Sequence, residues 1–314
     1  MRRLRIVWFG TGGTFTLAPL AAVSEAHDLV AAVVPRRRAG SRPHVLRSCA
    51  AWARSALGGP SHLRQAAAAR GIPVLELDPR EQRAAAEAMR ALEPDLLCVA
   101  SFPCLLRSEV FSAAPLGCIN LHPSLLPAYR GPSPWFWVYH NAEPSTGVTV
   151  HWVDAGEDSG AILAQEAFAV EHGMPGGRMV VEAASRGARL MRQTVDAIAA
   201  ERAQARANPP ESPTAPAARP RPGKDYVAWA DWPIRRVYHF LRGVMPGWYV
   251  PPKLRALVRG GRFALVGCAE RPHDEEPGSL ARGWPAARVY GRDGWLELRH
   301  QPLWRRAARS VLAG

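Results

Sequence analysis

One segment of this 314-residue chain joins an apolar strand to a proline-containing turn: Leu116-Gly-Cys-Ile-Asn-Leu-His-Pro-Ser-Leu-Leu-Pro-Ala-Tyr-Arg-Gly131. Side chains of a strand alternate between its two faces, so Asn120 and His122 share one face near the strand's end. Pro123 and Pro127 cannot donate to a strand ladder, so a loop must follow. An amide that donates to an oxyanion, beside an imidazole that titrates near neutral pH, is suited to acyl transfer.

A third polar group is needed to orient the imidazole, and the next compact polar run is Asp154-Ala-Gly-Glu-Asp-Ser-Gly160. This run follows the alternating segment 148–153, which predicts a strand. Two glycines bracket Asp158 and permit a tight turn that directs its carboxylate inward. A single histidine after a strand is usually structural, and a single aspartate between glycines is usually a turn residue. The combination of Asn120, His122 and Asp158 supplies an amide, a base and an orienting carboxylate, and therefore predicts a catalytic set.

Apolar strands alternate with helical segments through the first 100 residues. This alternation predicts an α/β fold with a mainly parallel sheet that helices cover on both faces. Ligands bind such sheets beyond the carboxyl ends of the strands, where Asn120 and His122 fall. The expected strands are 5–9, 29–34, 73–77 and 96–100, and the expected helices are about 14–25, 61–70, 79–93, 134–140 and 177–201.

The segment 202–223 contains six prolines, a density that excludes a helix or a central strand and predicts an extended linker. A helix is expected from about 226 to 242 beyond it. Short apolar strands separated by turns then suggest a small barrel. These strands are expected at 254–258, 262–268, 286–290 and 294–298. The sequence thus predicts a catalytic domain over 1–201, a linker over 202–223 and a C-terminal domain over 224–314.

The charge of the chain is strongly positive. There are 40 arginine and lysine residues against 27 aspartate and glutamate residues, a net charge of +13. Such an excess favours a polyanionic partner such as tRNA, although a solvated basic surface gives the same composition.

Composition also bears on location and metal content. The chain lacks a run of about 18 apolar residues, so no membrane partner is expected. Its N-terminus is basic and then apolar, as in a signal peptide, but glycines at 10, 12 and 13 interrupt the run and favour a buried first strand. The cysteines stand at 49, 98, 104, 118 and 268, without a C-x-x-C pair. This pattern predicts a reduced, cytoplasmic protein without structural zinc or a disulfide framework.

The two polar motifs together resemble one enzyme family. N-L-H-P-S-L-L-P-A-Y-R-G, followed by T-G-V-T-V-H-W-V-D-A-G-E-D-S-G, is similar to the 10-formyltetrahydrofolate-dependent formyltransferases. The resemblance implies a Rossmann-like formyltransferase domain that binds no dinucleotide. It assigns catalysis to Asn120, His122 and Asp158 and implies 10-formyltetrahydrofolate as the co-substrate, with no metal.

The resemblance also implies a folate pocket. It places the folate against the loop 101–106, the S-L-L-P turn 124–127 and the loop 152–158. Pro103 stands where the family often has glycine, which removes one backbone donor from this pocket. The residues that the resemblance assigns to folate binding are Phe102, Leu105, Ser124, Leu125, Leu126, Pro127, Val153 and Asp154.

The sequence says less about the molecule that accepts the formyl group than about the co-substrate. The layout resembles the methionyl-tRNA formyltransferases, because D-W, R-G-x-x-P-G-W, P-G-S and D-G-W-L-E-L follow in the order of their C-terminal OB-like domain. The basic loop 35–43 resembles their tRNA-facing loop and assigns substrate contacts to Arg37, Arg38 and Arg42. Methionyl-tRNA is therefore the expected acceptor.

Three alternatives stay open at this point. The aromatic segment 134–140 looks more like members that formylate small amines, such as amino sugars or biosynthetic intermediates. A formyltetrahydrofolate hydrolase would use water with the same catalytic residues, and a non-catalytic RNA-binding protein would need none of them. The sequence leaves the oligomeric state open.

Overall fold

A seven-stranded sheet forms the larger part of the protein. The computed structural model describes residues 2–36, 62–245, 248–258 and 263–301. The strand order is β3-β2-β1-β4-β5-β6-β7, with parallel pairing from β3 to β5 and antiparallel pairing of β5, β6 and β7. The strands are β1 Arg5–Gly10, β2 Asp28–Pro35, β3 Val74–Leu77, β4 Leu96–Ala100, β5 Cys118–His122, β6 Ser145–Trp152 and β7 Ile162–Ala169. The predicted α/β fold with a mainly parallel sheet is confirmed.

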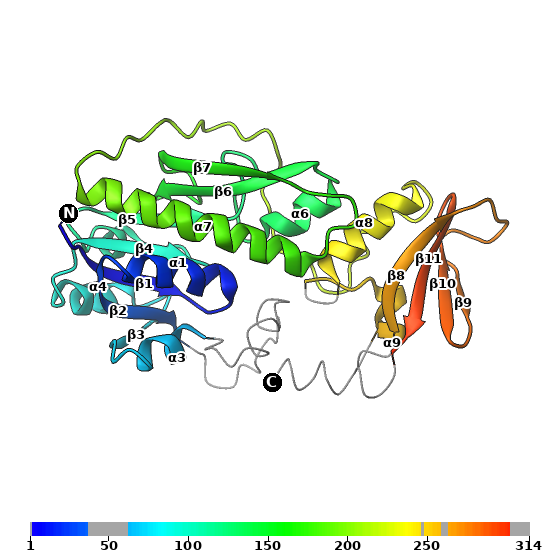
Figure 1. Ribbon diagram of the computed structural model, residues 1–314, viewed down its shortest axis with the longest axis horizontal. Helices are drawn as coiled ribbons and strands as arrows, with labels where there is room; N and C mark the ends of the chain where they lie inside the picture. Colours follow the sequence, from blue (N-terminus) through cyan, green and yellow to red (C-terminus); the bar gives the residue numbers. More distant parts are fainter. Residues whose placement is uncertain (1, 37–61, 246–247, 259–262, 302–314) are drawn as a thin grey trace.

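Helices cover both faces of this sheet (Figure 1). Strand β1 shows why, because it is apolar on both sides: Ile6 and Trp8 pack in one core cluster, while Val7 and Phe9 pack in the other. A strand buried on both faces reads as a continuous apolar run, as parallel sheets require. The first cluster includes residues of α1 Thr14–Ser24, α3 Leu63–Ala68, α6 Pro134–His140 and α7 Gly176–Ala199, and the second includes residues of α4 Gln82–Arg90 and α5 Ser108–Phe111.

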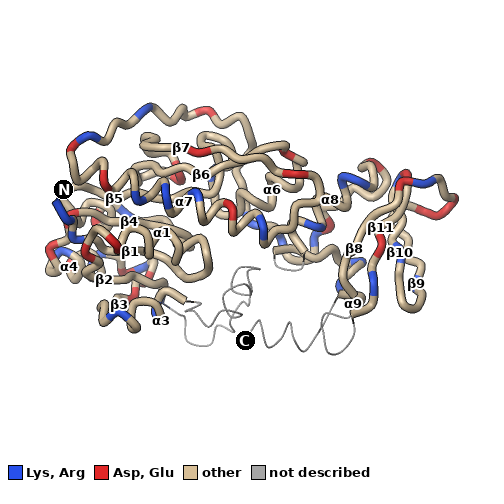
Figure 2. Tube along the Cα trace, viewed as in Figure 1, with Lys and Arg blue, Asp and Glu red and all other residues tan. Residues whose placement is uncertain are grey.

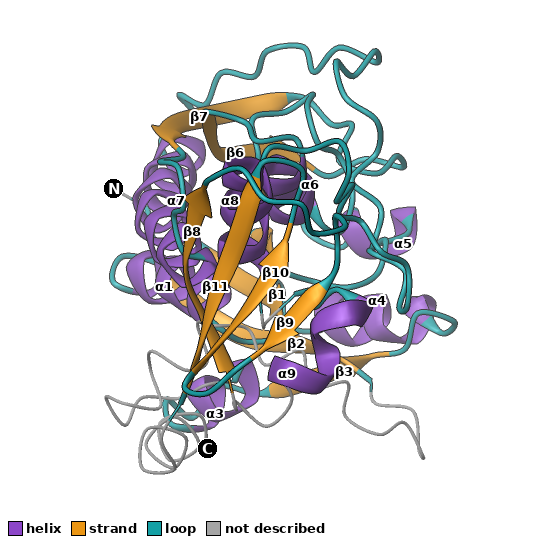
Figure 3. Cartoon of the chain, turned by 90° about the vertical axis from the view of Figure 1, so that its right-hand side faces the viewer, coloured by secondary structure: helices purple, strands orange, loops and turns teal. Residues whose placement is uncertain are grey.

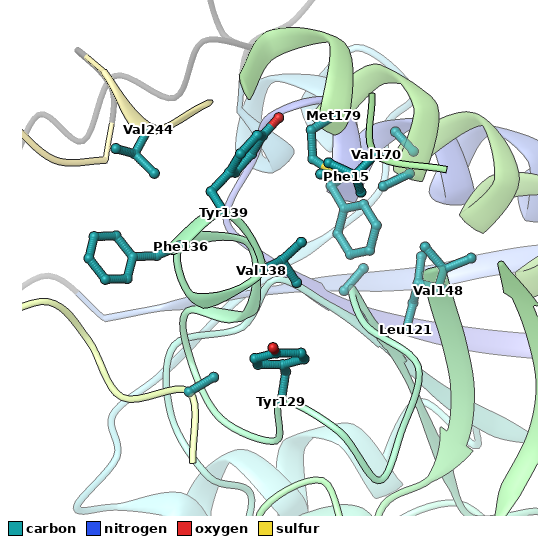
Figure 4. Close-up of a cluster of buried hydrophobic side chains, with 14 of the residues drawn as sticks. Phe15, Leu121, Tyr129, Phe136, Val138, Tyr139, Val148, Val170, Met179 and Val244 are labelled. Atoms are coloured by element: carbon teal, nitrogen blue, oxygen red, sulfur yellow. The ribbon is translucent and has the colours of Figure 1, made fainter. Parts of the chain in front are cut away.

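The core beneath the end of β5 is closely packed. Leu121 of β5, Val148 of β6, Phe15 of α1 and Met179 of α7 meet there (Figure 4). Gly187 allows α7 to approach the sheet, because a Cβ at that position would lie 2.7 Å from a methyl carbon of Leu121. This packing fixes the backbone of β5 and hence the two polar side chains that point away from this core.

The C-terminal part forms a second sheet. Its four antiparallel strands have the order β8-β11-β10-β9 and lie side by side in Figure 3. Among the described residues the two end strands, β8 and β9, do not pair with each other. The elements are α8 Ile234–Val244, a 3₁₀ turn η1 Pro252–Leu254, α9 Arg255–Val258, β8 Phe263–Glu270, β9 Leu280–Arg282, β10 Ala286–Tyr290 and β11 Gly294–His300.

Two expectations for this part were wrong. The segment 254–258 is helical and not a strand, because Leu254 ends the turn η1 and Arg255–Val258 form α9. The helix expected from 226 begins only at Ile234, because Pro233 occupies its N-cap with extended backbone. The strand β9 was not predicted. Within the described ranges, no helix combines the length and apolar character needed to cross a membrane.

Residues 202–218, which we call the strap, run extended from the end of α7 over β6 and β7 towards α6 (Figure 1). The strap is fastened along its length. Arg206 exchanges backbone hydrogen bonds with Ile162 at 2.8 and 2.9 Å. Further along, Ala217 donates its N–H to the Arg130 carbonyl at 2.7 Å and accepts from Ser133 at 2.9 Å. The extended conformation was predicted from the prolines, but its attachment to the larger sheet was not.

Candidate active site

Strand β5 presents Asn120 and His122 at the carboxyl edge of the sheet. Its antiparallel neighbour β6 pairs His151 directly with Asn120. Directly opposed residues of an antiparallel pair project on the same face, so these side chains converge. On the other side, β4 is parallel and pairs Val99 with Asn120. The loop that follows β4 therefore begins at the same edge.

Asp158 reaches this edge from the turn after β6. Its φ angle is +51°, a left-handed conformation that few non-glycine residues adopt. The turn closes tightly at Gly160, where a Cβ would lie 1.9 Å from the carbonyl oxygen of Trp152. Asp158 Oδ2 accepts the Gly131 backbone N–H at 2.9 Å and lies 3.3 Å from His122 Nδ1. The structure thus brings the three predicted catalytic residues together.

His122 is held between two acceptors. Its Nδ1 faces the Asp158 carboxylate, and its Nε2 lies 3.0 Å from the carbonyl oxygen of Tyr129. The side chain is only 4% exposed. Burial alone would lower the pKa of His122, but the Asp158 carboxylate, the Tyr129 carbonyl and the charge of Glu157 raise it above its ordinary 6.5. The doubly protonated ring satisfies both acceptors, so this environment favours the imidazolium.

Asp158 is the counterion of this ring. Burial alone would raise the pKa of Asp158, but the neighbouring His122 imidazolium holds it well below its ordinary 3.8. The result is a carboxylate paired with an imidazolium in a site that is largely withdrawn from water. Such a pair places fixed charge beside the Asn120 amide, where an acyl reaction develops negative charge.

His151 joins the set, although no sequence motif assigns it a catalytic role. Its Nδ1 lies 2.7 Å from the Trp152 carbonyl oxygen, so Nδ1 carries the proton and Nε2 is left as an acceptor. Asn120 Nδ2 lies 3.1 Å from that Nε2 and 3.3 Å from Asp158 Oδ1. The one signal in the sequence was a histidine near the end of an alternating strand.

The predicted apolar folate contacts lie near this edge. Phe102 and Val153 pack against the same core cluster, and Phe102 meets Phe9 edge to face at 5.5 Å. Leu105 is 60% exposed. Buried Gln82 fixes the backbone here, because its amide donates to the Leu105 carbonyl at 2.9 Å.

The S-L-L-P turn is held from beneath. Ser124 Oγ donates to the Ala128 carbonyl at 2.7 Å, and Leu126 N–H donates to Thr149 Oγ1 at 3.2 Å. Leu125 packs over Gly147, where a Cβ would lie 2.4 Å from a methyl carbon of Leu125. Pro127 completes the turn and accepts at its carbonyl from Ser212 of the strap at 2.8 Å. These bonds keep the turn rigid, while the folate contacts themselves stay predictions.

The remaining predicted residues divide into two groups. Asp154 is exposed, and its Oδ1 accepts from Gly156 N at 3.1 Å and from Ser159 Oγ at 2.6 Å, so it shapes the catalytic turn. The predicted substrate contacts Arg37, Arg38 and Arg42 lie outside the described residues. Across the described ranges, no group of three or more His, Cys, Asp or Glu side chains is arranged to hold a metal ion.

The architecture and these residues match a known family. A family model described as formyl transferase matches residues 5–195, which include all seven strands of the larger sheet. The chain belongs to the formyl transferase family. It is therefore a formyltransferase, as the N-L-H-P-S-L-L-P motif and the later aspartate turn predicted.

Relatives in this family extend beyond the catalytic part. The chain is 31% identical over 304 residues to a methionyl-tRNA formyltransferase of Chlorobium chlorochromatii (strain CaD3), which covers 94% of this chain and 90% of the relative. It is 34% identical over 285 residues to the methionyl-tRNA formyltransferase of Roseiflexus sp. (strain RS-1), covering 88% of this chain and 81% of the relative.

Solved structures in the formyl transferase family share the fold over nearly the whole chain. An N-formyltransferase from Helicobacter canadensis, in complex with folinic acid and dTDP-3-aminofucose, gives a TM-score of 0.64 at 15% identity and covers 95% of this chain and 100% of that one. The sugar 3N-formyl transferase WlaRD gives 0.62 at 13% identity and covers 96% of this chain and 98% of that one. At these identities the likeness establishes the fold alone.

Proposed function

We propose that this formyltransferase transfers the formyl group of 10-formyltetrahydrofolate to the amino group of methionyl-tRNA. The observation that carries the chemistry is the buried His122–Asp158 pair beside the Asn120 amide. The relatives that support the acceptor are named methionyl-tRNA formyltransferase and align over both parts of the chain. A protein with this acceptor works in the cytoplasm during translation initiation.

Asn120 supplies the oxyanion donor. In the structure its Nδ2 is 3.1 Å from His151 and 3.3 Å from Asp158, so both of its N–H bonds face acceptors. Stabilising the formyl oxygen requires one of these N–H groups to turn towards the substrate. The second N–H then keeps the amide oriented. A donor that is placed in advance in this way stabilises the transition state without reorganising water.

His122 transfers protons to the folate nitrogen and from the amine. The attacking amine must lose one proton and the departing folate nitrogen must gain one, so a single group can serve both steps. As an imidazolium His122 donates to the leaving nitrogen, and the neutral ring then takes the proton of the amine. Its Nε2 is engaged by the Tyr129 carbonyl at 3.0 Å, so proton exchange requires this hydrogen bond to open. Asp158 orients the ring and favours its charged form.

The folate would supply the activated formyl carbon. The residues proposed to hold it are the apolar Phe102, Leu105 and Val153, the S-L-L-P turn 124–127, and Asp154. The fit is chemical: exposed Leu105 offers an apolar contact for a flat ring. The backbone of the S-L-L-P turn is held at a fixed position, because the Leu126 N–H donates to Thr149 and the Leu126 carbonyl accepts from Gln165.

We propose tRNA contacts for the basic loop with Arg37, Arg38 and Arg42 and for the C-terminal part. The chain would then act as two domains, 1–201 and 224–314, joined by 202–223, with an OB-like C-terminal domain whose basic and aromatic side chains face nucleic acid. Helix α7 is a poorer candidate surface. Its Arg186 is neutralised by Glu182 and Glu166, and acidic and basic segments alternate along it in Figure 2.

The deciding experiment measures release of tetrahydrofolate from 10-formyltetrahydrofolate with charged methionyl-tRNA, uncharged tRNA, a panel of amino sugars and small amines, or no acceptor. Stimulation by methionyl-tRNA alone supports the proposal, and its affinity should fall steeply with salt. Stimulation by a small amine alone would mean that the acceptor is that amine and not methionyl-tRNA. Equal rates without any acceptor would make the protein a hydrolase.

Variants separate catalysis from folding in the same assay. Asn120→Ala and His122→Ala should each lower turnover by at least about a hundredfold, the usual contribution of such groups. His172→Ala is the matched control, because His172 is an exposed histidine whose Nε2 contacts the Arg235 carbonyl away from the site. Near-normal turnover of both site variants would reject the catalytic assignment.

A further inference from the structure

One residue of the strap contacts the backbone of the catalytic aspartate. The Asn208 side-chain amide donates to the Asp158 carbonyl and to the Gly160 carbonyl, each at 3.0 Å. Its Oδ1 accepts from Arg130 Nη2 at 2.7 Å. Both N–H bonds and the oxygen of this side chain therefore have partners, and the two donor bonds bracket the tight turn that presents Asp158.

Arg130 extends this contact into a clamp. Its Nε donates to the same Asp158 carbonyl at 3.1 Å, while Nη1 donates to the Pro210 carbonyl at 2.9 Å and Nη2 to the Pro209 carbonyl at 2.6 Å. The planar guanidinium thus fills the space between the turn and the strap with hydrogen bonds at fixed angles. Asn208 and Arg130 hold the Asp158 carbonyl from both sides.

The turn needs such a support. Asp158 has a φ of +51°, and residues 154–157 before it are exposed, so little packing fixes this backbone. The carboxylate must nevertheless stay 3.3 Å from His122 Nδ1. Asn208 is suited to the task because Pro209 follows it and restricts its own backbone to extended conformations. Asn208 therefore loses little backbone entropy when its amide binds the turn.

We propose that Asn208 is a positioning residue of formyl transfer, which acts through the backbone of Asp158 and not on the substrate. The inference rests on the roles of His122 and Asp158 proposed above. It also assigns the strap a part in catalysis. Without the two donor bonds, the turn relaxes, the carboxylate moves away from His122, and the ring loses the partner that keeps it charged and oriented.

The expected effect is on turnover and not on substrate binding. A displacement of about 1 Å at a catalytic group can cost about a hundredfold in rate, so Asn208→Ala should lower kcat by about tenfold to a hundredfold. The KM values for folate and acceptor should change by less than about threefold, because Asn208 touches neither.

Two further variants identify the part of the amide that matters. Asn208→Asp keeps the oxygen for Arg130 and nearly the same volume but removes both donors, so it should be as slow as Asn208→Ala. Asn208→Gln restores the amide on a longer stem and should recover part of the rate. Trp137→Phe is the control, because it removes another anchor of the strap, the 2.8 Å bond from Trp137 Nε1 to the Ala218 carbonyl. It should keep wild-type kcat.

A second readout does not need an acceptor. Titration of ¹⁵N-histidine-labelled protein, with the His122 signal assigned from His122→Gln, follows the protonation of this ring directly. Asn208→Ala should lower the pKa of His122, and Trp137→Phe should not. If no acceptor supports turnover of the wild type, the proposed function fails while this titration still decides the role of Asn208. Wild-type kcat in Asn208→Ala and Asn208→Asp, together with an unchanged His122 titration in Asn208→Ala, would overturn the inference.

Discussion

His122 Nε2 lies 3.0 Å from the carbonyl oxygen of Tyr129, only seven residues along the chain, while its Nδ1 lies 3.3 Å from Asp158. The N-L-H-P-S-L-L-P-A-Y turn therefore folds back on the histidine that it contains. A ring with an acceptor at each nitrogen is a stable cation but a poor base. In the proposed mechanism, the contact to Tyr129 must open before the ring can exchange a proton with the amine.

The pH dependence of stability follows from this pair. The pKa of His122 is raised above 6.5, so its contribution to the free energy of unfolding is complete below pH 6.5 and is lost as pH rises through the folded-state pKa. The pKa of Asp158 is lowered below 3.8, so its contribution is present above pH 3.8 and is lost as pH falls through the folded-state value. Chemical denaturation of the wild type and Asp158→Asn should therefore differ most between about pH 4 and 6.5 and converge at alkaline pH. A constant difference up to pH 9 would contradict a charged His122.

Replacing Asp158 by asparagine keeps the shape and removes the charge. Asp158→Asn should lower kcat by about a hundredfold to ten-thousandfold, because His122 loses both its orientation and its charged form. The loss of stability should be smaller than the roughly 3–5 kcal/mol typical of a buried pair broken on one side, since the imidazole can shed its proton. Steady-state kinetics and thermal melts measure both quantities. A variant with normal kcat would remove Asp158 from the mechanism.

His151 should act through Asn120. His151→Phe removes the acceptor 3.1 Å from Asn120 Nδ2, so the amide loses one of its two orienting partners and kcat should fall about tenfold. His151→Gln offers an oxygen at similar reach and should retain most of the rate. If the two variants were equally slow, the packing of His151 and not its acceptor nitrogen would be the cause.

Two glycines of the catalytic turn should respond differently to alanine. At Gly160 the new methyl group would lie 1.9 Å from the Trp152 backbone oxygen, which cannot move without breaking the turn. Gly160→Ala should therefore cost about 1–3 kcal/mol of stability and lower kcat. At Gly156 the nearest atom is Ser159 Oγ at 2.0 Å, the end of a side chain that can rotate. Gly156→Ala should melt near the wild type, and equal losses would show that the turn tolerates neither change.

Much of the architecture followed from local pattern. The boundaries of β4 and α6 agree with the expected 96–100 and 134–140, because a fully apolar run and a proline at the first helical turn are strong local signals. Strand β7 was missed, because Gln165 and Glu166 interrupt its apolar alternation. It forms because β6 pairs with it, and strand pairing cannot be predicted from one segment alone.

The residues of the candidate site also divide into those that local motifs predicted and those that depend on a distant partner. Asn120, His122 and Asp158, which the structure brings together, were predicted as a set because they lie in two motifs whose order is itself informative. His151 and Asn208 were not, since each gains its role from a partner far along the chain. Asn120 stands opposite His151 by strand register, 31 residues away, and Asn208 is 50 residues from Asp158. The prolines predicted that the strap is extended, but they do not indicate which surface it packs against.

The fastening of the strap limits how the protein can be divided. A fragment cut at residue 201 would keep every strand of the larger sheet and all of α7, and would resemble a complete unit by its secondary structure. It would nevertheless lack Asn208, Ser212 and the backbone at Ala217 that support the catalytic loops. Given the proposed role of Asn208, the shortest fragment that contains a whole active site ends after residue 218, within the segment that the sequence alone marks as a spacer.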